Sequence, residues 1–472
     1  MKIEKVPNKI DDIQKGLIDG DYSIIDLVDY YINKIEINNS KLNALITVTK
    51  NYAYDRAVYL QKEYEKERNN ILSRYPLFGM MVTHKDLFLT KGIRTTAGSK
   101  VLENYIPEYN STVVERLEDA GCILLGKANC DAWAHGSSGE NSDFGPTLNP
   151  WDREYVPGGS SSGSGCCVGA QFSLISTGTD TCGSVRLPAN YCGVYGLKPT
   201  YGVLSRYGVI AMASSLDTVG ILGLTSHDIN KVFNLIKGED GIDATLLDTP
   251  KNKFNDKKIR IGYPKEFFQE GLNSEVRENI EKVVKIFKEM KYEIIEVSMP
   301  STKYAIDVYY VIQPAEVSSN LARYDGIRYG FSRSCFGDEA KRRILLGNYV
   351  LSAGYNDEYY KKAMKVRTVI IKEVQDAFEN ADVLIAPVAP TPPFRLGKKT
   401  NNPLEMYLTD IYAATANLTG IPSLAVPYGF SLNNLPLGYQ LMTNSLNEEV
   451  LFRLAGRFEK YVDYEPKIAD IK

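Results

Sequence analysis

The chain has 472 residues, of which 44% are hydrophobic, and a formal net charge of −3. This length exceeds a usual single core, so we expect one large α/β unit with additions, or two domains. The balanced charge gives no footprint for direct nucleic-acid binding, so another chain would hold any nucleic acid. The N-terminus is not typical of a signal peptide, and no run of ~18 apolar residues is present. We therefore expect a soluble, cytoplasmic protein that makes no membrane contact.

The cysteines and histidines do not indicate a metal site. Seven cysteines, an odd number, include the adjacent pair Cys166 and Cys167, which cannot easily form two independent disulfides. Reduced thiols that fill apolar space fit best. Neither the cysteine spacing nor the three histidines match a zinc pattern, so we predict no metal in this chain.

The first half of the chain alternates between helical and strand patterns. Ser23 followed by Asp26 is typical of a helix N-terminus, and the apolar face that follows extends to Ile35. The further elements expected in this half are a charged helix at 52–68, a strand at 78–83 that delivers Lys85 to its end, a helix at 112–120, a strand at 122–127 and a short buried strand at 172–175.

The second half continues the alternation. Strands at 259–263 and 292–297 bracket a helix capped by Ser274, which predicts a βαβ unit. The remaining expected elements are a helical region at 304–372, strands at 382–385, 423–426 and 437–442, and a closing helix at 448–462. We therefore predict an α/β fold with a mixed, mainly parallel central sheet covered by helices on both faces.

We expect one large fold made of four parts. They are an N-terminal helical part (1–70), a core (71–230), a βαβ and helical insertion (231–372), and C-terminal strands with the closing helix (373–472).

One stretch, residues 157–196, carries the chemistry: PGGSSSGSGCCVGAQFSLISTGTDTCGSVRLPANYCGVYG. A loop this rich in glycine is costly to fix and is kept where backbone must approach a ligand closely. Two groups of hydroxyl side chains, Ser160 to Ser162 and Ser184, flank the expected strand. This layout predicts a nucleophile assisted by a second hydroxyl group.

Three familiar arrangements fit this stretch poorly. A phosphate-binding loop between Gly158 and Gly163 would lack its lysine. A nucleophile elbow centred on Ser161 needs a downstream histidine, and only His227 is available. Cys182 as the nucleophile has no histidine in a suggestive context. These alternatives stay open but are disfavoured.

The arrangement that fits better joins Ser184 to Lys85. Serine is a poor nucleophile at neutral pH, and with so few histidines its proton must go to another base. A lysine with the ordinary pKa of ~10.4 would be protonated, so burial must lower the pKa of Lys85. A serine between the two would relay the proton. The plain alternative is a solvated lysine at the end of a strand.

Three sequence segments together resemble the amidase signature family of amide hydrolases. They are PGGSSSGSG, then GTDTCGSVRLPANYCGVYGLKPTYG, with HKD upstream. The resemblance implies that Ser184 is the nucleophile, that Ser160 is the relay serine after a cis peptide from Gly159, and that Lys85 is the base. It also implies an oxyanion hole made of backbone amides from Thr181, Cys182, Gly183 and Ser184. The family usually has glycine where this chain has Ser162 and Cys182, which puts the turn geometry and the room above the pocket in question.

Longer sequence segments extend the resemblance over nearly the whole chain. They are similar to the branch of this family that is formed by the A subunits of glutamyl-tRNA(Gln) amidotransferases. They include DAWAHGSSGENSDFGPTLNPWD, EVSSNLARYDGIRYG, KRRILLGNYVLSAGYNDEYYKKAMKVRT and MYLTD. The resemblance implies a subunit that hydrolyses glutamine and passes ammonia to a B subunit. That partner uses ATP and Mg²⁺ to amidate the misacylated tRNA it holds, while a small C subunit braces the pair. No cofactor is implied in this chain.

By the same resemblance, Arg343 would meet the glutamine carboxylate, Asp410 its ammonium group, and Tyr309 would line the site. Each residue has a plain alternative: Arg343 with Arg342 as a solvated helix face, Tyr309 as a core aromatic, and Asp410 as a helix cap. Two other functions also stay open. One is a stand-alone amidase with the same Lys85, Ser160 and Ser184, and the other is a catalytically silent scaffold subunit.

Overall fold

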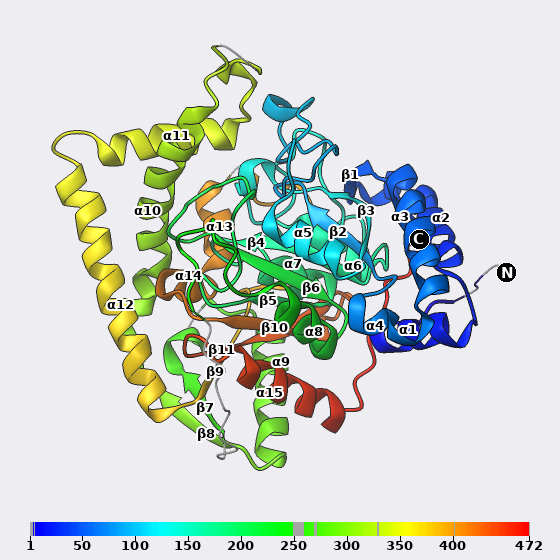
Figure 1. Ribbon diagram of the computed structural model, residues 1–472. Helices are drawn as coiled ribbons and strands as arrows, with labels where there is room; N and C mark the ends of the chain where they lie inside the picture. Colours follow the sequence, from blue (N-terminus) through cyan, green and yellow to red (C-terminus); the bar gives the residue numbers. More distant parts are fainter. Residues whose placement is uncertain are drawn as a thin grey trace.

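A mixed eleven-stranded β-sheet runs through the computed structural model of the protein (Figure 1), which describes residues 3, 5–248, 259–268, 271–327, 330–400 and 402–471. Within these residues the strand order is β1-β3-β2-β4-β6-β5-β10-β11-β9-β7-β8. The strands are β1 (Leu45–Val48), β2 (Met81–Lys85), β3 (Ile123–Ala128), β4 (Ile175–Asp180), β5 (Tyr195–Lys198), β6 (Thr218–Gly223), β7 (Arg260–Pro264), β8 (Glu293–Val297), β9 (Val383–Ala386), β10 (Ser423–Phe430) and β11 (Pro436–Thr443).

Helices surround the sheet, with α1 to α4 on the right of Figure 1 and α10 to α12 on the left. They are α1 (Ile10–Asp19), α2 (Ile24–Leu42), α3 (Lys50–Lys66), α4 (Ile71–Arg74), α5 (Thr112–Asp119), α6 (Ser162–Gly169), α7 (Arg186–Cys192), α8 (Ser226–Ile236), α9 (Ser274–Glu289), α10 (Ala305–Asn320), α11 (Asp338–Leu351), α12 (Lys361–Asn380), α13 (Pro403–Tyr407), α14 (Ala414–Thr419) and α15 (Glu448–Tyr461). The predicted fold class is confirmed. Within the described residues, no helix has the length and apolar character needed to cross a bilayer.

The sheet is mixed as predicted, but it is not mainly parallel. Among the ten strand pairings of the described residues, four are parallel: β2 with β3, β2 with β4, β7 with β8, and β7 with β9. The expectation was wrong because alternation with helices does not fix strand direction. The centre of the sheet is built from antiparallel neighbours, including the β10–β11 hairpin, which needs only a short connection.

The Gly- and Ser-rich stretch folds differently from the expectation. The strand predicted at 172–175 is β4, which instead covers Ile175–Asp180, so the strand carries the hydroxyl residues that follow the apolar run. Before it lies a helix that the composition did not indicate, α6, all of whose residues are buried. Glycine disfavours a helix by ~1 kcal/mol, but here it is required for close packing. A Cβ at Gly163 would clash with the carbonyl of Ala44.

Most other predicted elements agree with the structure within a few residues. Ser23 and Asp26 form a complete capping box at the start of α2. The βαβ unit is present, with β7 parallel to β8, although the residue that caps α9 is Asn273 and not Ser274. Each of the four predicted parts of the chain contributes strands to the one sheet. The boundaries between those parts stay a prediction.

Helix α11 packs closely against α10 at a glycine. A Cβ at Gly347 would clash with the carbonyl of Pro314 and would lie 2.8 Å from the Ser318 Cβ. A Cβ at Gly456, in α15, would instead have room: outside its own helix, the one described atom within 4 Å would be the Ser226 Oγ, at 3.7 Å. The spacing of α10 and α11 also matters for Arg343, which lies one turn before Gly347 and hydrogen-bonds with α10.

We expect Gly347→Ala to lower the free energy of unfolding by ~1–3 kcal/mol, because the added methyl group forces the two helices apart. The matched control, Gly456→Ala, should raise it by up to ~1 kcal/mol, because alanine favours a helix and has room there. Denaturant unfolding of the two variants and the parent chain would test this. Equal stability of the two variants would contradict the packing argument.

Candidate active site

Lys85 lies at the end of β2, between β3 and β4, and its side chain is 0% exposed. Its Nζ donates hydrogen bonds to the Ser160 Oγ at 2.8 Å and to the Thr179 Oγ1 at 2.9 Å. Burial lowers the pKa of Lys85 to about 8, while nearby groups such as Cys130 and Asp131 oppose this shift. The structure thus has a desolvated lysine whose pKa is shifted in the predicted direction.

Ser160 follows a cis peptide bond from Gly159, the bond that the family resemblance implies. Its carbonyl accepts a hydrogen bond from the Asp131 amide at 3.2 Å, and the next amide, of Ser161, donates to the Ser184 carbonyl at 3.1 Å. A Cβ at Gly159 would clash with the Asp131 carboxylate. Glycine is therefore required here, and the packing sets the Ser160 hydroxyl against Lys85.

Ser184 lies in the turn between β4 and α7, and it is 7% exposed. Its hydroxyl group makes no hydrogen bond with any residue that the structure describes, whereas the Ser161 hydroxyl donates to the Thr179 carbonyl at 3.3 Å. The structure therefore brings Lys85 and Ser160 into direct contact and joins Ser160 to Ser184 through adjacent backbone. The side-chain step from Ser184 to Ser160 is not among its hydrogen bonds.

The turn that carries Ser184 is held by the carboxylate of Asp180. This carboxylate accepts hydrogen bonds from the amides of Gly183 (2.7 Å), Val185 (3.2 Å) and Arg186 (3.4 Å). The Gly183 amide is therefore engaged, which argues against its predicted place in the oxyanion hole. The amides of Thr181, Cys182 and Ser184 are not among the donors to Asp180. Gly183 instead supplies backbone shape, with a left-handed φ of 98°.

A buried arginine ties this turn to the C-terminal part of the chain. The Arg186 guanidinium group donates to Asp180 and also to the Gln440 Oε1 at 2.8 Å, the Asn417 Oδ1 at 2.6 Å and the Ala413 carbonyl at 3.0 Å. Both Arg186 and Asp180 are fully buried. A buried ion pair with this many further hydrogen bonds fixes the turn to β11 and α14.

The two departures from the family pattern fit without backbone strain. Cys182 is not among the described non-glycine residues that have a positive φ, and neither is Ser162. The Ser162 hydroxyl donates to the Thr147 Oγ1 at 3.2 Å. The Cys182 thiol is 3% exposed, and burial raises its pKa well above the ordinary value, an effect to which Asp410 adds. A protonated thiol is a poor nucleophile, which disfavours catalysis by Cys182.

The three predicted substrate-binding residues gather around this turn. A Cβ at Gly183 would lie 3.6 Å from the Asp410 Oδ1. Arg343 and Asp410 both act electrostatically on the Cys182 thiol, and Cys182 acts on the Tyr309 hydroxyl group. Tyr309, Arg343 and Asp410 are 3%, 3% and 5% exposed. The structure thus brings together residues that lie far apart in the sequence.

Burial separates Arg343 from its neighbour. The Arg343 side chain is 4% exposed and donates to the Glu339 Oε1 and the Gln313 Oε1, each at 2.7 Å. Its guanidinium group lies over the rings of Tyr310 and Tyr407 at 4.7 and 4.8 Å. The Arg342 side chain is 49% exposed. The solvated helix face therefore describes Arg342 but not Arg343.

Asp410 belongs to a short 3₁₀ helix, Leu408–Asp410, and its carboxylate accepts a hydrogen bond from the Ser137 hydroxyl group. Burial raises the pKa of Asp410 to about 8, with Ser137 opposing the shift. An ammonium group placed beside it would favour the charged carboxylate. Asp410 is thus a buried carboxyl group beside the turn that carries Ser184, and its side chain does not cap a helix within the described residues.

Sequence reasoning missed Thr179, Ser137 and Gln313. Thr179 could have been predicted. Side chains alternate between the two faces of a strand, so the face on which this hydroxyl residue lies, five residues before Ser184, follows from the strand pattern. Ser137 and Gln313 gave no signal, since their contacts with Asp410 and Arg343 join segments 273 and 30 residues apart.

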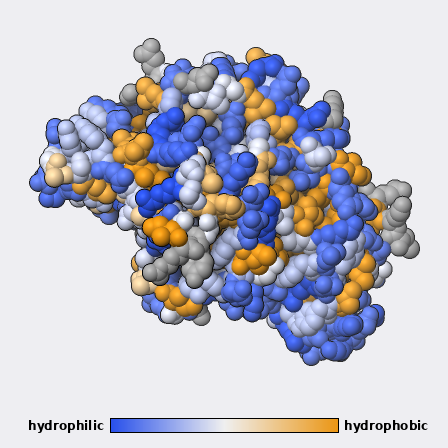
Figure 2. All heavy atoms as spheres, turned by 90° about the horizontal axis from the view of Figure 1, so that it is seen from above, coloured by the Kyte–Doolittle hydropathy of each residue, from blue (hydrophilic) through white to orange (hydrophobic). Residues whose placement is uncertain are grey.

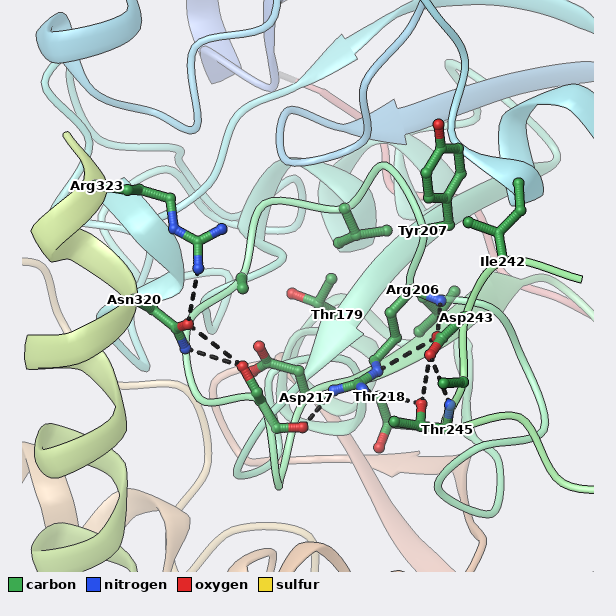
Figure 3. Close-up of a pocket in the computed structure, with 15 residues that line it drawn as sticks. Thr179, Arg206, Tyr207, Asp217, Thr218, Ile242, Asp243, Thr245, Asn320 and Arg323 are labelled. Atoms are coloured by element: carbon green, nitrogen blue, oxygen red, sulfur yellow. Dashed lines mark hydrogen bonds and ion pairs between the residues drawn. The ribbon is translucent and has the colours of Figure 1, made fainter. Parts of the chain in front are cut away.

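Thr179 also lines a pocket of ≈ 370 Å³ (Figure 3). Arg206, Asp217, Asn320 and Arg323 are among its other lining residues, and the Arg206 side chain points toward Asp243. Neither Ser184 nor the predicted substrate-binding residues line this pocket. It therefore adjoins the lysine through Thr179, but it does not include the turn that carries Ser184.

The histidine that a nucleophile elbow would need is elsewhere. The His227 side chain is 66% exposed and lies 3.0 Å from an Asp11 carboxylate oxygen. The described residues contain no group of three or more His, Cys, Asp or Glu side chains arranged to hold a metal ion. The chemistry that the described residues offer is thus that of hydroxyl groups, a buried amine and backbone amides.

The geometry is that of an amide hydrolase, and comparison with known proteins agrees. The amidase family model matches residues 26–452, so the chain belongs to the amidase family.

Within this family the chain is similar to the A subunit of glutamyl-tRNA(Gln) amidotransferase from several bacteria. The protein of that name from Trichlorobacter lovleyi is 44% identical over 488 residues, which cover 99% of this chain and 100% of the relative. The one from Coxiella burnetii is 44% identical over 476 residues (96% and 97%). The crystal structure of the same protein from Thermotoga maritima is 36% identical, covers 95% of each chain and has a TM-score of 0.80.

We expect Thr179→Val to lower kcat for amide hydrolysis on the order of tenfold, because Lys85 loses one of its two hydrogen-bond acceptors. Thr218→Val is a matched control. Thr218 lines the same pocket, but its hydroxyl group donates to the Leu216 carbonyl and not to the Lys85 site. Steady-state kinetics of both variants would test this, and equal losses would contradict a role for the Thr179 hydroxyl group.

We expect Cys182→Ala to keep amide hydrolysis within a fewfold of the parent rate, since a backbone amide at position 182 does not depend on the side chain. The measurement is the rate of amide hydrolysis by the variant and by the parent chain, with thiol titration of the same samples to verify that one cysteine has been removed. Loss of all activity in this variant, with the fold intact, would revive the thiol as the nucleophile.

Proposed function

We propose that this chain is the glutamine-hydrolysing A subunit of a glutamyl-tRNA(Gln) amidotransferase. The observation that carries the proposal is the contact of the buried Lys85 Nζ with the Ser160 Oγ at 2.8 Å, beside the turn that presents Ser184. Similarity over nearly the full length to proteins of that name supports it.

In the proposed reaction, the neutral amine of Lys85 takes a proton from Ser160 as Ser160 takes one from Ser184. The Ser184 Oγ then bonds to the side-chain amide carbon of glutamine. The short rotation that joins the two serine hydroxyl groups is part of the proposal. Backbone amides of Thr181, Cys182 and Ser184 would stabilise the negative oxygen of the tetrahedral intermediate.

Collapse of this intermediate breaks the carbon–nitrogen bond. The proton held by Lys85 returns through Ser160 to the leaving nitrogen, which departs as ammonia and leaves a glutamyl ester on Ser184. Water then attacks the ester, with the same groups accepting its proton, and releases glutamate. The protons balance over the cycle, and the proposed steps use only groups of this chain and water.

Substrate binding would use the charges around the turn. The Arg343 guanidinium group would pair with the glutamine carboxylate, and Asp410 would pair with its ammonium group. Tyr309 would line the site between them. Burial raises the pKa of Asp410 to about 8, and an ammonium group bound beside it would oppose this shift and favour the charged carboxylate.

We further propose that ammonia passes to a B subunit, which holds the tRNA and uses ATP and Mg²⁺, and that a C subunit braces the assembly in the cytoplasm. The net charge of −3 supports tRNA binding by another chain. Hydrophobic side chains along α11 and α12 are exposed, such as Leu345 (69%) and Val369 (48%). The face of the molecule shown in Figure 2 is hydrophilic over much of its area, with hydrophobic patches between. Such exposure supports contacts with other subunits.

The direct test is ammonia release from glutamine by the parent chain, Ser184→Ala and Lys85→Ala, each alone and with coexpressed B and C subunits. We expect both variants to lose at least ~10³-fold in rate, since neither nucleophile nor base can be replaced by water. Equal ammonia release from the parent chain and both variants would contradict the proposal that this chain is the enzyme. Activity without any association with B and C would favour the stand-alone amidase.

The pH dependence is a separate prediction. Only the neutral amine of Lys85 can accept a proton, and its fraction rises with pH toward the pKa of about 8. We therefore expect kcat at saturating glutamine, where the bound ammonium group favours charged Asp410, to rise by up to about tenfold per pH unit between about pH 6 and 7.5 and to level off above about pH 8. Initial rates across this range, with protein stability checked at each pH, would test it. A flat profile would contradict the lysine base.

A further inference from the structure

Two buried polar side chains beside Arg343 have unused hydrogen-bonding groups. Gln313, in α10, is 0% exposed, and its Oε1 accepts a hydrogen bond from the Arg343 Nη1 at 2.7 Å. Because an arginine only donates, this contact fixes which end of the amide is the oxygen. The Gln313 Nε2 has no partner among the residues that the structure describes. An amide donor is thus left free next to the guanidinium group.

His135 is the second of these side chains. It is 1% exposed, and neither ring nitrogen has a hydrogen-bond partner in the described part of the chain. Burial lowers the pKa of His135 well below its ordinary value, and the positive charge of Arg343 adds to the effect. The imidazole is therefore neutral, with one N–H donor and one acceptor.

The backbone that delivers His135 is itself unusual. The two residues before it, Trp133 and Ala134, both have left-handed φ angles, 58° and 63°, which are unfavourable for non-glycine residues. Ser137, two residues after His135, donates to Asp410. One strained segment therefore connects the two ends of the proposed substrate site.

The charge at Arg343 is only partly compensated. Glu339 accepts a hydrogen bond from the Arg343 Nε, but the same carboxylate also pairs with Arg342. Two cations thus share one anion. The rings of Tyr310 and Tyr407 fix the orientation of the guanidinium group without neutralising it. A buried cation flanked by free N–H groups is chemically complementary to a carboxylate.

We propose that Gln313 and His135 complete, with Arg343, the subsite that binds the α-carboxylate of the substrate. This inference rests on the proposed function and deepens it, because it makes the site specific for amides that carry a carboxylate. The Gln313 Nε2 and one His135 ring N–H donate to the carboxylate oxygens. Buried polar groups rarely stay unpaired, and here the substrate supplies the missing acceptors.

The test compares two amides that differ only in this carboxylate, glutamine and 4-aminobutanamide. Gln313→Leu and His135→Leu should each raise KM for glutamine on the order of tenfold, with kcat within about twofold, and leave kcat/KM for 4-aminobutanamide nearly unchanged. His135→Asn, which keeps a donor, should recover part of the loss. Calorimetry of glutamine binding to the same variants in a Ser184→Ala background should show the same weakening without turnover.

Tyr439→Phe is the matched control. It also removes a buried hydroxyl group that lacks a partner among the described residues, but in an aromatic cluster with Phe287 and Phe458. Its KM should not change. Equal losses on both amides, or unchanged glutamine KM and binding in all variants, would overturn the inference while leaving glutamine hydrolysis in place. Absence of glutamine hydrolysis in the parent complex would instead reject the proposed function itself.

Discussion

The site depends on the exclusion of water from one amine. Lys85 ends a strand that has neighbours on both sides, and its side chain is fully buried. Burial disfavours the charged form, and two hydroxyl groups offer hydrogen bonds without offering a compensating charge. Burial thereby sets the proton affinity of the lysine, and the Gly- and Ser-rich segment supplies the two hydroxyl groups that it contacts. As a result, the pKa of the lysine lies at about 8, well below its ordinary value.

Much of the fold was predictable because the signals are local. The capping box at Ser23, the βαβ unit around α9 and the strand that ends at Lys85 are all written in short periodic patterns. The sequence also predicted that serine hydroxyl groups in residues 157–196 form the candidate site, because the phosphate-loop, nucleophile-elbow and cysteine alternatives fit that stretch poorly. Sheet order and strand direction were not, because they depend on which distant strands meet.

The rest could not be predicted because packing overrides composition. A run of Ser and Gly argues against a helix, yet α6 forms because its glycines allow contact with Ala44 and Asn129. The Gly183 amide was expected to face the substrate, but it donates a hydrogen bond to the carboxylate of Asp180. Gln313 is an ordinary helix residue in the sequence, and only the close approach of α11 places it beside Arg343.

The network around Arg186 carries a consequence for biosynthesis. The turn with Ser184 is anchored to side chains and carbonyls of residues 413–440, which are synthesised more than 200 residues after the turn itself. Until those residues are synthesised, the Arg186 guanidinium group lacks its hydrogen-bond acceptors from them, and the turn between β4 and α7 lacks this anchor. A nascent chain that stops before residue 413 therefore carries Ser184 on a turn that lacks these anchors.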